Sequence, residues 1–195
     1  ETQSANEYKS EMIKKRLGGE AYALRAYYKY LLLQYHAGKI DDGRLMGFPI
    51  VNKSLTLNDN LELPRNTFAE CITSIFSDID IAVSKLPATW YDKPTGGENP
   101  VENGYYNITS GAIFKGRMNG NAARALKARV ALLAASPAFS EGSGVTWAQA
   151  ATIAGELLKE LGNLYINTKL PAINNHTFYK ETQNKEIIFN RSLAQ

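Results

Sequence analysis

The stretch from Gly19 to Tyr35 is the feature that most constrains the fold of this chain. It reads GEAYALRAYYKYLLLQY and places apolar or aromatic residues three and four positions apart, the spacing of one helix face. We expect that face to be buried; its members are Leu24, Tyr27, Tyr28, Leu31, Leu32 and Tyr35. The phase continues backwards through Tyr8, Met12, Ile13, Leu17 and Ala21, which predicts one helix from about Ser4 to His36. Gly18 and Gly19 should weaken it, because a glycine inside a helix costs about 1 kcal/mol relative to alanine.

Three further helices follow from caps and apolar periods. Thr67 and Glu70 form a T-x-x-E capping box before an apolar stripe that Pro87 ends. An alanine-rich helix is expected over 122–135, and Thr146 with Gln149 opens a helix that Gly162 ends. The sequence therefore predicts a mainly all-α fold of tetratricopeptide-like helical hairpins, with long loops and at most short β pieces. The hairpins are expected at about 4–86 and 122–161, in a single domain over 1–195.

The remaining segments are expected to be irregular. Residues 37–66 and 87–121 are rich in Gly, Pro, Asn and Asp, which favours loops. The tail over 162–195 contains a β-prone run, Glu186–Phe189, with no partner strand in view. A connector as long as 37–66 is uncommon in a compact domain unless it serves a function or carries small strands of its own.

Composition and charge exclude several classes of protein. With 44% apolar and 21% charged residues the chain is not globally disordered, and a net charge of +3 without a basic run argues against nucleic-acid binding. Cys71 is the only cysteine, so no internal disulfide is expected, and we predict a small buried side chain there. His36 and His176 are too far apart to suggest a transition-metal site. No apolar run reaches the roughly 20 residues that span a bilayer.

Aromatic residues in the 87–121 loop are the best candidates for a binding site. Sugar recognition needs flat apolar rings together with amides or carboxylates for the hydroxyl groups. The segment offers both, and the candidate glycan-binding residues are Trp90, Tyr91, Asn103, Tyr105, Tyr106 and Asn107. The alternative is that these side chains pack the loop against the helices. The tyrosines near Arg25 are expected to be core residues, and Arg25 itself to pair with a carboxylate between helices, as Lys127 and Arg129 should.

Catalysis and bound cofactors are not indicated. The pairs Asp41/Asp42 and Asp78/Asp80 are expected to be solvated, whereas a glycosidase holds its two carboxyl groups across a cleft. No G-x-S-x-G motif is present. Asp41, Asp42, Asn58 and Asp59 could offer oxygen atoms to calcium, but their spacing matches no known calcium loop.

Five motifs in order resemble the SusD/RagB family of outer-membrane lipoproteins. They are GEAYALRAYYKYLLLQYHAGKI, LPRNTFAECITSIFSDIDIAVSKLP, AARALKARVALLAASPAF, WAQAATIAGELL and NKEIIF. The family carries a G-E-A-x-x-L-R-A-x-Y-Y motif, a capped P-R-[ST] helix ending in L-P, an A-L-K-A-R-V-x-L-x-A-A-S-P helix and a W-x-x-A helix. The similarity extends from Gly19 to Phe189.

The resemblance implies a non-catalytic protein that binds glycans or other nutrients at the cell surface. It would act as the lid of a SusC-like, TonB-dependent transporter and be held at the outer membrane by a lipid anchor. Family chains are longer, with a lipid-modified cysteine at the start and a loop-rich region after the E-I-I-F segment. We therefore expect this sequence to be a piece of such a chain, with the anchor inferred rather than seen.

A second functional class remains open. A helical-repeat scaffold that binds a protein or peptide would expose large residues along its helices and have plain loops. The sugar-binding interpretation predicts the reverse, with exposed aromatic residues in 38–64 and 88–121.

Overall fold

The computed structural model describes residues 3–162. The predictions for His176, for the β-prone run Glu186–Phe189 and for the tail beyond Gly162 concern residues outside the described range. The elements, in order, are α1 (Gln3–His36), β1 (Gly38–Lys39), β2 (Leu45–Met46), α2 (Phe68–Lys85), α3 (Pro100–Ser110), the 3-10 turn η1 (Ala112–Phe114), α4 (Gly120–Ala135), α5 (Ser140–Ser143) and α6 (Trp147–Leu161).

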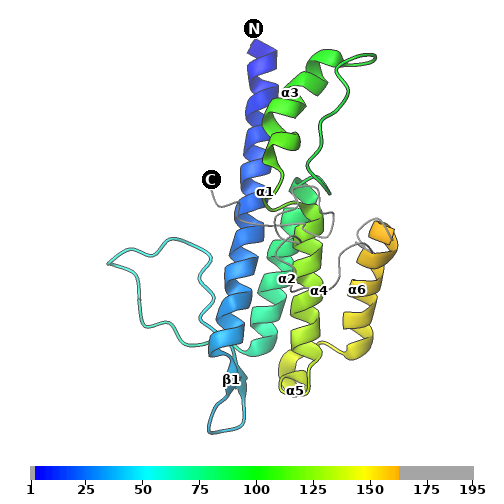
Figure 1. The fold of residues 1–195 in the computed structure, drawn as a ribbon. Coiled ribbons are helices and arrows are strands. Elements are labelled where there is room, and N and C mark those ends of the chain that lie inside the picture. The colour runs from blue at the N-terminus through cyan, green and yellow to red at the C-terminus, as the bar shows by residue number, and fades with distance from the viewer. Residues whose placement is uncertain (1–2, 163–195) are drawn as a thin grey trace, which may run out of the picture.

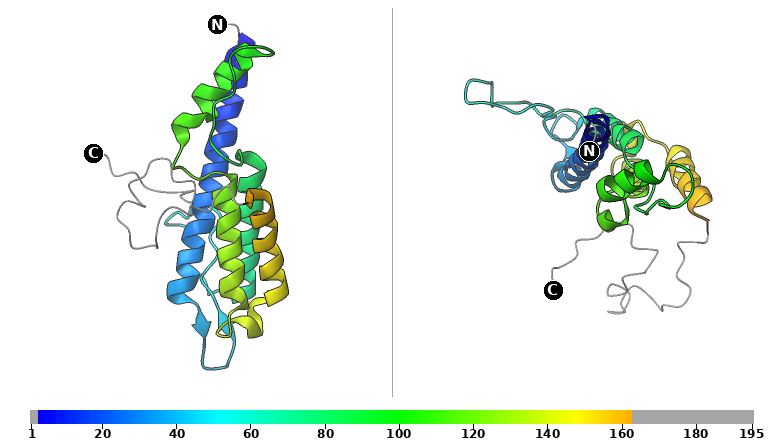
Figure 2. Two further views of the ribbon diagram at one scale, coloured as in Figure 1. Left: turned by 45° about the vertical axis from the view of Figure 1, so that its right-hand side comes forward. Right: turned by 90° about the horizontal axis from the view of Figure 1, so that it is seen from above.

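Four helices stand side by side in a row and alternate in direction (Figures 1 and 2). The order is α1, α2, α4 and α6, so that α1 and α6 form the two edges. Each hairpin packs through its own pair, α1 with α2 and α4 with α6, and α2 contacts α4 between them. The only sheet among the described residues is an antiparallel pairing of β1 with β2, in which Gly38 faces Met46. The predicted fold class, helical hairpins with short β pieces, is confirmed.

The predicted helix starts of α2 and α6 are confirmed in detail. The side chain of Thr67 accepts a hydrogen bond from the amide of Glu70, and the Glu70 carboxylate accepts one from the Thr67 amide. Thr146 and Gln149 make the same reciprocal pair at α6. These boxes satisfy amides that the first helical turn leaves without partners.

The core lies between α1, α2 and α4. On α2 the predicted stripe is buried, with Phe68, Ile75 and Ile79 fully enclosed. The Cys71 side chain is also fully buried, as predicted, and its Sγ donates to the Phe48 carbonyl. Phe68 stacks on Phe139, their ring centroids 4.8 Å apart, which joins α2 to the segment after α4.

The buried face of α1 is the opposite of the one predicted. Its core contacts come from small or inward-pointing residues, among them Ala23, Ala26 and Leu33, and from the buried charged residues Glu20 and Lys29. The predicted core face is largely exposed; Tyr28 is 60% and Tyr35 77% accessible. The prediction was wrong because it chose the face from the apolar residues alone, whereas Arg16, Glu20 and Lys29 are buried and paired. The continuous helix itself is confirmed.

The second predicted loop, 87–121, contains a helix that was not foreseen. Pro100 occupies the first turn of α3, a position where proline is favoured, but Asn103, Gly104 and Asn107 have weak helix propensity. Tertiary contacts explain why the helix forms: Arg16 of α1 donates from Nε to the Thr109 carbonyl at 2.7 Å. α4 begins at Gly120, two residues earlier than expected.

Arg16 and Glu20 also connect α1 to the chain after α3. The Arg16 guanidinium bonds Glu20 and lies 4.0 Å from the centroid of the Phe114 ring. Arg117 pairs with the other Glu20 oxygen at 2.7 Å. The N-terminal half of α1 is thus fixed to α3 and η1 by charges as much as by apolar contacts. Over residues 3–162, no helix is both long and apolar enough to cross a membrane.

Gly18 and Gly19 differ in how much space a side chain would have, and substituting alanine at each tests the packing of α1 on α2. A Cβ on Gly19 would lie 2.6 Å from Leu86 Cγ, whereas one on Gly18 would meet nothing closer than Lys85 Cδ at 3.7 Å. We expect Gly18→Ala to raise the free energy of unfolding by about 0.5–1 kcal/mol through helix propensity. Gly19→Ala should lower it by about 1–3 kcal/mol through overpacking. Urea unfolding measures both, and equal stabilisation by the two changes would contradict the α1–α2 packing.

Candidate functional site

The structure places the six predicted glycan-binding residues in one region but gives them different environments. Trp90 is only 3% exposed and belongs to the core. Its Nε1 donates to the Arg117 carbonyl at 3.1 Å, and its ring lies beside Phe114. No face of this ring is open to a sugar, so Trp90 packs its loop against the helices, as the alternative interpretation held.

The two asparagines shape the loop. Asn107 accepts from the Lys93 amide at 2.7 Å and donates to the Lys93 carbonyl at 2.9 Å. Asn103 donates to the Pro94 carbonyl at 2.8 Å. These bonds fasten the chain after Trp90 to α3. Both the oxygen and the nitrogen of the Asn107 side-chain amide have hydrogen-bond partners.

Two pairs of tyrosines involve α3, Tyr8 of α1 with Tyr105 and Tyr91 of the preceding loop with Tyr106, and we call these four residues the tyrosine surface. Tyr91 lies 5.9 Å from Tyr106, and Tyr8 lies 6.3 Å from Tyr105, measured between ring centroids. Tyr106 is buried, and burial raises the pKa of its hydroxyl. Tyr91 is 50% exposed and has the most accessible ring of the predicted set. Tyr8 was missed because it was assigned to the core face of the first helix.

Trp90 and Tyr91 provide a test of these assignments. Trp90→Ala should lower the free energy of unfolding by about 3–5 kcal/mol, because it removes a large buried ring. Tyr91→Ala, the matched control, should cost less than about 1 kcal/mol since half of its side chain is already in water. Urea unfolding followed by circular dichroism measures both; similar small losses would show that Trp90 is not a core residue.

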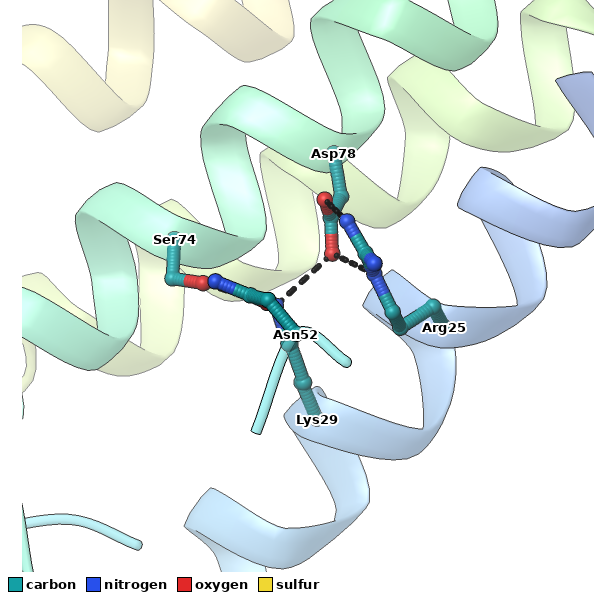
Figure 3. Close-up of polar contacts among 5 residues, drawn as sticks. All are labelled: Arg25, Lys29, Asn52, Ser74 and Asp78. Carbon is teal, nitrogen blue, oxygen red and sulfur yellow. Dashed lines mark hydrogen bonds and ion pairs between the residues drawn. The ribbon is translucent and has the colours of Figure 1, made fainter. Parts of the chain in front are cut away.

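A groove of about 650 Å³ lies between α1 and α2 and is bordered by the segment around Asn52. We call it the α1–α2 groove. It is lined by Tyr22, Arg25, Ile50, Asn52, Ala69, Glu70, Thr73, Ser74, Ser77, Asp78 and Ile81. Figure 3 shows the polar contacts that four of these residues, Arg25, Asn52, Ser74 and Asp78, make with one another or with Lys29.

Lys29 and Asp78 form the centre of this cluster. Lys29 Nζ donates to Asp78 Oδ2 at 2.9 Å, to Ser74 Oγ at 2.7 Å and to Asn52 Oδ1 at 3.1 Å. These three bonds use every hydrogen of the ammonium group. Arg25 donates from Nε to Asp78 Oδ2 at 2.8 Å and from Nη2 to Oδ1 (Figure 3). The predicted pairing of Arg25 with a carboxylate between helices is confirmed.

The electrostatics of the cluster follow from burial and pairing. Burial alone would raise the pKa of Asp78, but the hydrogen bonds and charges of Arg25 and Lys29 outweigh it and hold that pKa below its ordinary value. The hydrogen bond to Asp78 raises the pKa of Arg25, against the lowering effect of burial. The expectation that Asp78 is solvated was wrong. Asp80 is exposed and pairs with Lys127 at 2.5 Å, and Arg129 lies near the Tyr30 ring.

The groove offers donors and acceptors to a polar ligand. Arg25 of α1 keeps 36% of its side chain exposed. The hydroxyl-bearing residues Thr73, Ser74 and Ser77 line the groove from α2. Such a surface can bind hydroxyl groups through hydrogen bonds.

In residues 3–162, no group of three or more His, Cys, Asp and Glu side chains comes together. Two of the carboxylates considered for calcium, Asp42 and Asp59, have partners within the chain. Asp42 bonds Arg44, and Asp59 bonds Lys53 and Thr56. These contacts lower the pKa of both acids, that of Asp42 through Arg44 and that of Asp59 mainly through the Thr56 amide.

The depressed pKa of Asp78 predicts a pH-dependent stability. At pH 7, Asp78→Asn should lower the free energy of unfolding by about 3–5 kcal/mol, because the buried Lys29 and the partly exposed Arg25 lose their counter-charge. The wild-type advantage should be complete above the unfolded-state pKa of about 3.9 and shrink as the pH falls through the lower folded-state value. Urea unfolding at pH 7, 5 and 3 measures this. Asp80→Asn, which removes an exposed pair, should cost at most about 1 kcal/mol; equal losses at Asp78 and Asp80 would refute the buried cluster.

Comparison with known proteins identifies the family. A SusD-like family model described as "Starch-binding associating with outer membrane" matches residues 2–97, the part that includes the first two sequence motifs. The chain belongs to the SusD/RagB family. No curated protein matches the chain.

Solved structures of SusD-like proteins share the fold. A SusD-like protein from Bacteroides fragilis is 28% identical, with a TM-score of 0.52 over 76% of this chain and 22% of its own. A SusD-like carbohydrate binding protein from Bacteroides vulgatus is 20% identical, with a TM-score of 0.59 over 100% of this chain and 32% of its own. A SusD superfamily protein from the same species is 22% identical, with a TM-score of 0.51 over 85% of this chain and 29% of its own. This SusD-like chain therefore spans less than a third of the length of each.

Proposed function

We propose that this protein is a non-catalytic, carbohydrate-binding component of an outer-membrane uptake system. The observation that carries the proposal is the family match on residues 2–97, whose description names starch binding and association with the outer membrane. A structurally similar Bacteroides vulgatus protein is itself described as carbohydrate binding.

The proposed ligand is an oligosaccharide or another nutrient, and its contact region is the tyrosine surface. Tyr91 and Tyr105 remain candidates because their rings are at least partly accessible, and the Lys93 ammonium lies 4.3 Å from the neighbouring Tyr106 ring. Exposed rings can stack on the C–H faces of pyranose sugars, while ammonium groups can donate to hydroxyls. Asn103, Tyr106 and Asn107 support this surface by fixing α3 and the preceding loop, and Trp90 supports it from the core.

The proposed partner is a SusC-like, TonB-dependent transporter, for which this protein would serve as the binding lid. The proposed location is the cell surface, with a lipid anchor to the outer membrane. Both proposals rest on family membership. The Asp78 carboxylate accepts hydrogen bonds from Arg25 and Lys29, which supports a structural role for this acid.

One observation favours the second class, a helical scaffold that binds another protein. Large apolar side chains are exposed along α1, the feature that this alternative predicts. The 87–121 segment also exposes an aromatic residue, Tyr91, as sugar binding predicts. The two functions are compatible, because the exposed α1 residues and Tyr91 are different parts of the surface.

Binding to a glycan array, followed by calorimetric titration of the best ligand, tests the proposed function. Tyr91→Ala combined with Tyr105→Ala should weaken binding about tenfold, the effect of losing roughly 1.4 kcal/mol of stacking. The matched control is Trp147→Ala, since Trp147 is exposed at the start of α6. Unchanged affinity in the double variant would reject the tyrosine surface. An array with no bound glycan would reject carbohydrate binding by this chain.

A further inference from the structure

The ion cluster beside the α1–α2 groove contains two cations and one carboxylate. Lys29 and Asp78 are almost enclosed, with 6% and 4% of their side chains exposed, whereas Arg25 lines the groove and is 36% exposed. Asp78 is the only acid paired with either cation in residues 3–162, and its carboxylate accepts hydrogen bonds from both. One positive charge is therefore left unbalanced within the cluster, and Arg25 presents it to the groove.

Hydrogen-bond donors without a partner surround this charge. Arg25 uses Nε and Nη2 on Asp78, and its Nη1 has no hydrogen-bond partner among residues 3–162. Asn52 accepts from Lys29 through its side-chain oxygen, and its amide nitrogen donates to no residue of the described range. The Ser74 hydroxyl also accepts from Lys29 and keeps its own hydrogen to donate. Figure 3 shows that these donors come from α1, α2 and the loop before α2.

The other end of the groove is acidic, but its carboxylate already has partners. Glu70 lies eight residues before Asp78 on α2, about 12 Å along the helix. Its Oε2 accepts from the amide and the hydroxyl of Thr67. Thr73 and Ser77, both exposed, lie between the two acids on the same helix. An anion therefore fits the opposite, cationic end of the groove, and hydroxyl groups fit the stretch towards Glu70.

We propose that the α1–α2 groove binds a sugar acid, a uronic acid whose carboxylate lies on Arg25 and the Asn52 amide and whose hydroxyl groups lie along α2. An ionised carboxylate only accepts hydrogen bonds, which matches donors that have no partner, and its charge strengthens each bond. The carboxylate is inferred from the groove itself, while the choice of a sugar to carry it rests on the proposed function.

The groove is large enough for such a ligand, and Arg25 is already held in place. The volume of about 650 Å³ is within the range of roughly 300–1,000 Å³ that is typical of small-molecule sites. The Arg25 guanidinium lies 4.7 Å from the centroid of the Tyr22 ring, and two of its nitrogen atoms are fixed by Asp78. A donor that is fixed in advance loses little conformational entropy when a ligand binds.

Titration of the chain with sodium glucuronate, followed by two-dimensional ¹H–¹⁵N NMR at pH 7 and constant ionic strength, tests the proposal. The Arg25 Nε–H signal and the backbone amides of Asn52 and Ser77 should shift, with a dissociation constant on the order of 1 mM, as expected for a ligand of this size. Glucose, which lacks the carboxylate, should bind at least about tenfold more weakly. Equal binding of glucose would overturn the proposal. An absence of shifts in the groove would also overturn it, and is the result expected if an acidic side chain of the protein occupies these donors.

Two asparagine substitutions in the same segment separate the site from a general effect of charge. Asn52→Asp keeps an oxygen for Lys29 but loses the amide hydrogens and adds a negative charge, so glucuronate binding should fall at least about tenfold. Its urea midpoint should be at or above that of the wild type, because the added carboxylate can pair with Lys29. Asn58→Asp, the matched control, adds the same charge at an exposed position outside the groove and should bind glucuronate like the wild type. Undiminished binding by Asn52→Asp, or a lower midpoint, would overturn the proposal.

The groove and the tyrosine surface can fail independently. Tyr91→Ala combined with Tyr105→Ala should leave the glucuronate shifts unchanged, because neither residue lines the groove. Loss of these shifts in the double variant would place the uronate at the tyrosine surface and overturn the proposal. Unchanged affinity of the double variant for a glycan found on the array concerns the tyrosine surface alone.

Discussion

The ion cluster of Lys29, Asp78 and Arg25 determines how α1 is turned. Moving an ammonium and a carboxylate out of water costs several kcal/mol for each ion unless other groups replace the lost contacts. Here Asp78 takes both cations, and Ser74 and Asn52 take the remaining hydrogens of Lys29. Once Lys29 faces α2, the helical period directs Leu24, Tyr28 and Leu31 outward. The exposed apolar face of α1 and the buried charges are thus two results of one rotation.

This cluster and a second one, formed by Arg16, Glu20 and Arg117, connect segments that are far apart in sequence. Asp78 lies on α2 and Asn52 in the segment before it, so Lys29 fixes both to α1. Arg16 and Glu20 do the same for α3 and Arg117. The tyrosine surface depends on this second set, because α3 carries Tyr105 and Tyr106 and would have few contacts without α1.

Much of the fold could be predicted because it follows local rules. The capping boxes at Thr67 and Thr146 and the apolar stripe of α2 depend on residues within one or two helical turns. The face of α1 could not be read in this way, since hydrophobic periodicity assumes that charged residues point to solvent, and the partner of Lys29 is 49 residues away. α3 was missed for a similar reason: its glycine and asparagines favour a loop, and the contact with Arg16 is long-range. Among the candidate site residues, Trp90 could not be told from an exposed aromatic residue without its neighbours.

The family assignment and the surface chemistry point in the same direction. A SusD-like scaffold holds the partly exposed rings of Tyr91 and Tyr105 on α3 and on the loop that Asn103 and Asn107 fasten to it. The place of α3 depends in turn on its contact with Arg16 of α1.

The rotation of α1 is tested most directly by comparing two neighbouring substitutions, Lys29→Met and Tyr28→Ser, in urea unfolding at about 1 µM protein. The structure predicts that losing the buried ammonium lowers the free energy of unfolding by about 3 kcal/mol or more, since Asn52 and Ser74 lose their donor and Asp78 keeps only Arg25. Losing the exposed ring should change it by less than about 1 kcal/mol. A large loss at Tyr28 with little effect at Lys29 would mean that the apolar face is the buried one and would contradict the account.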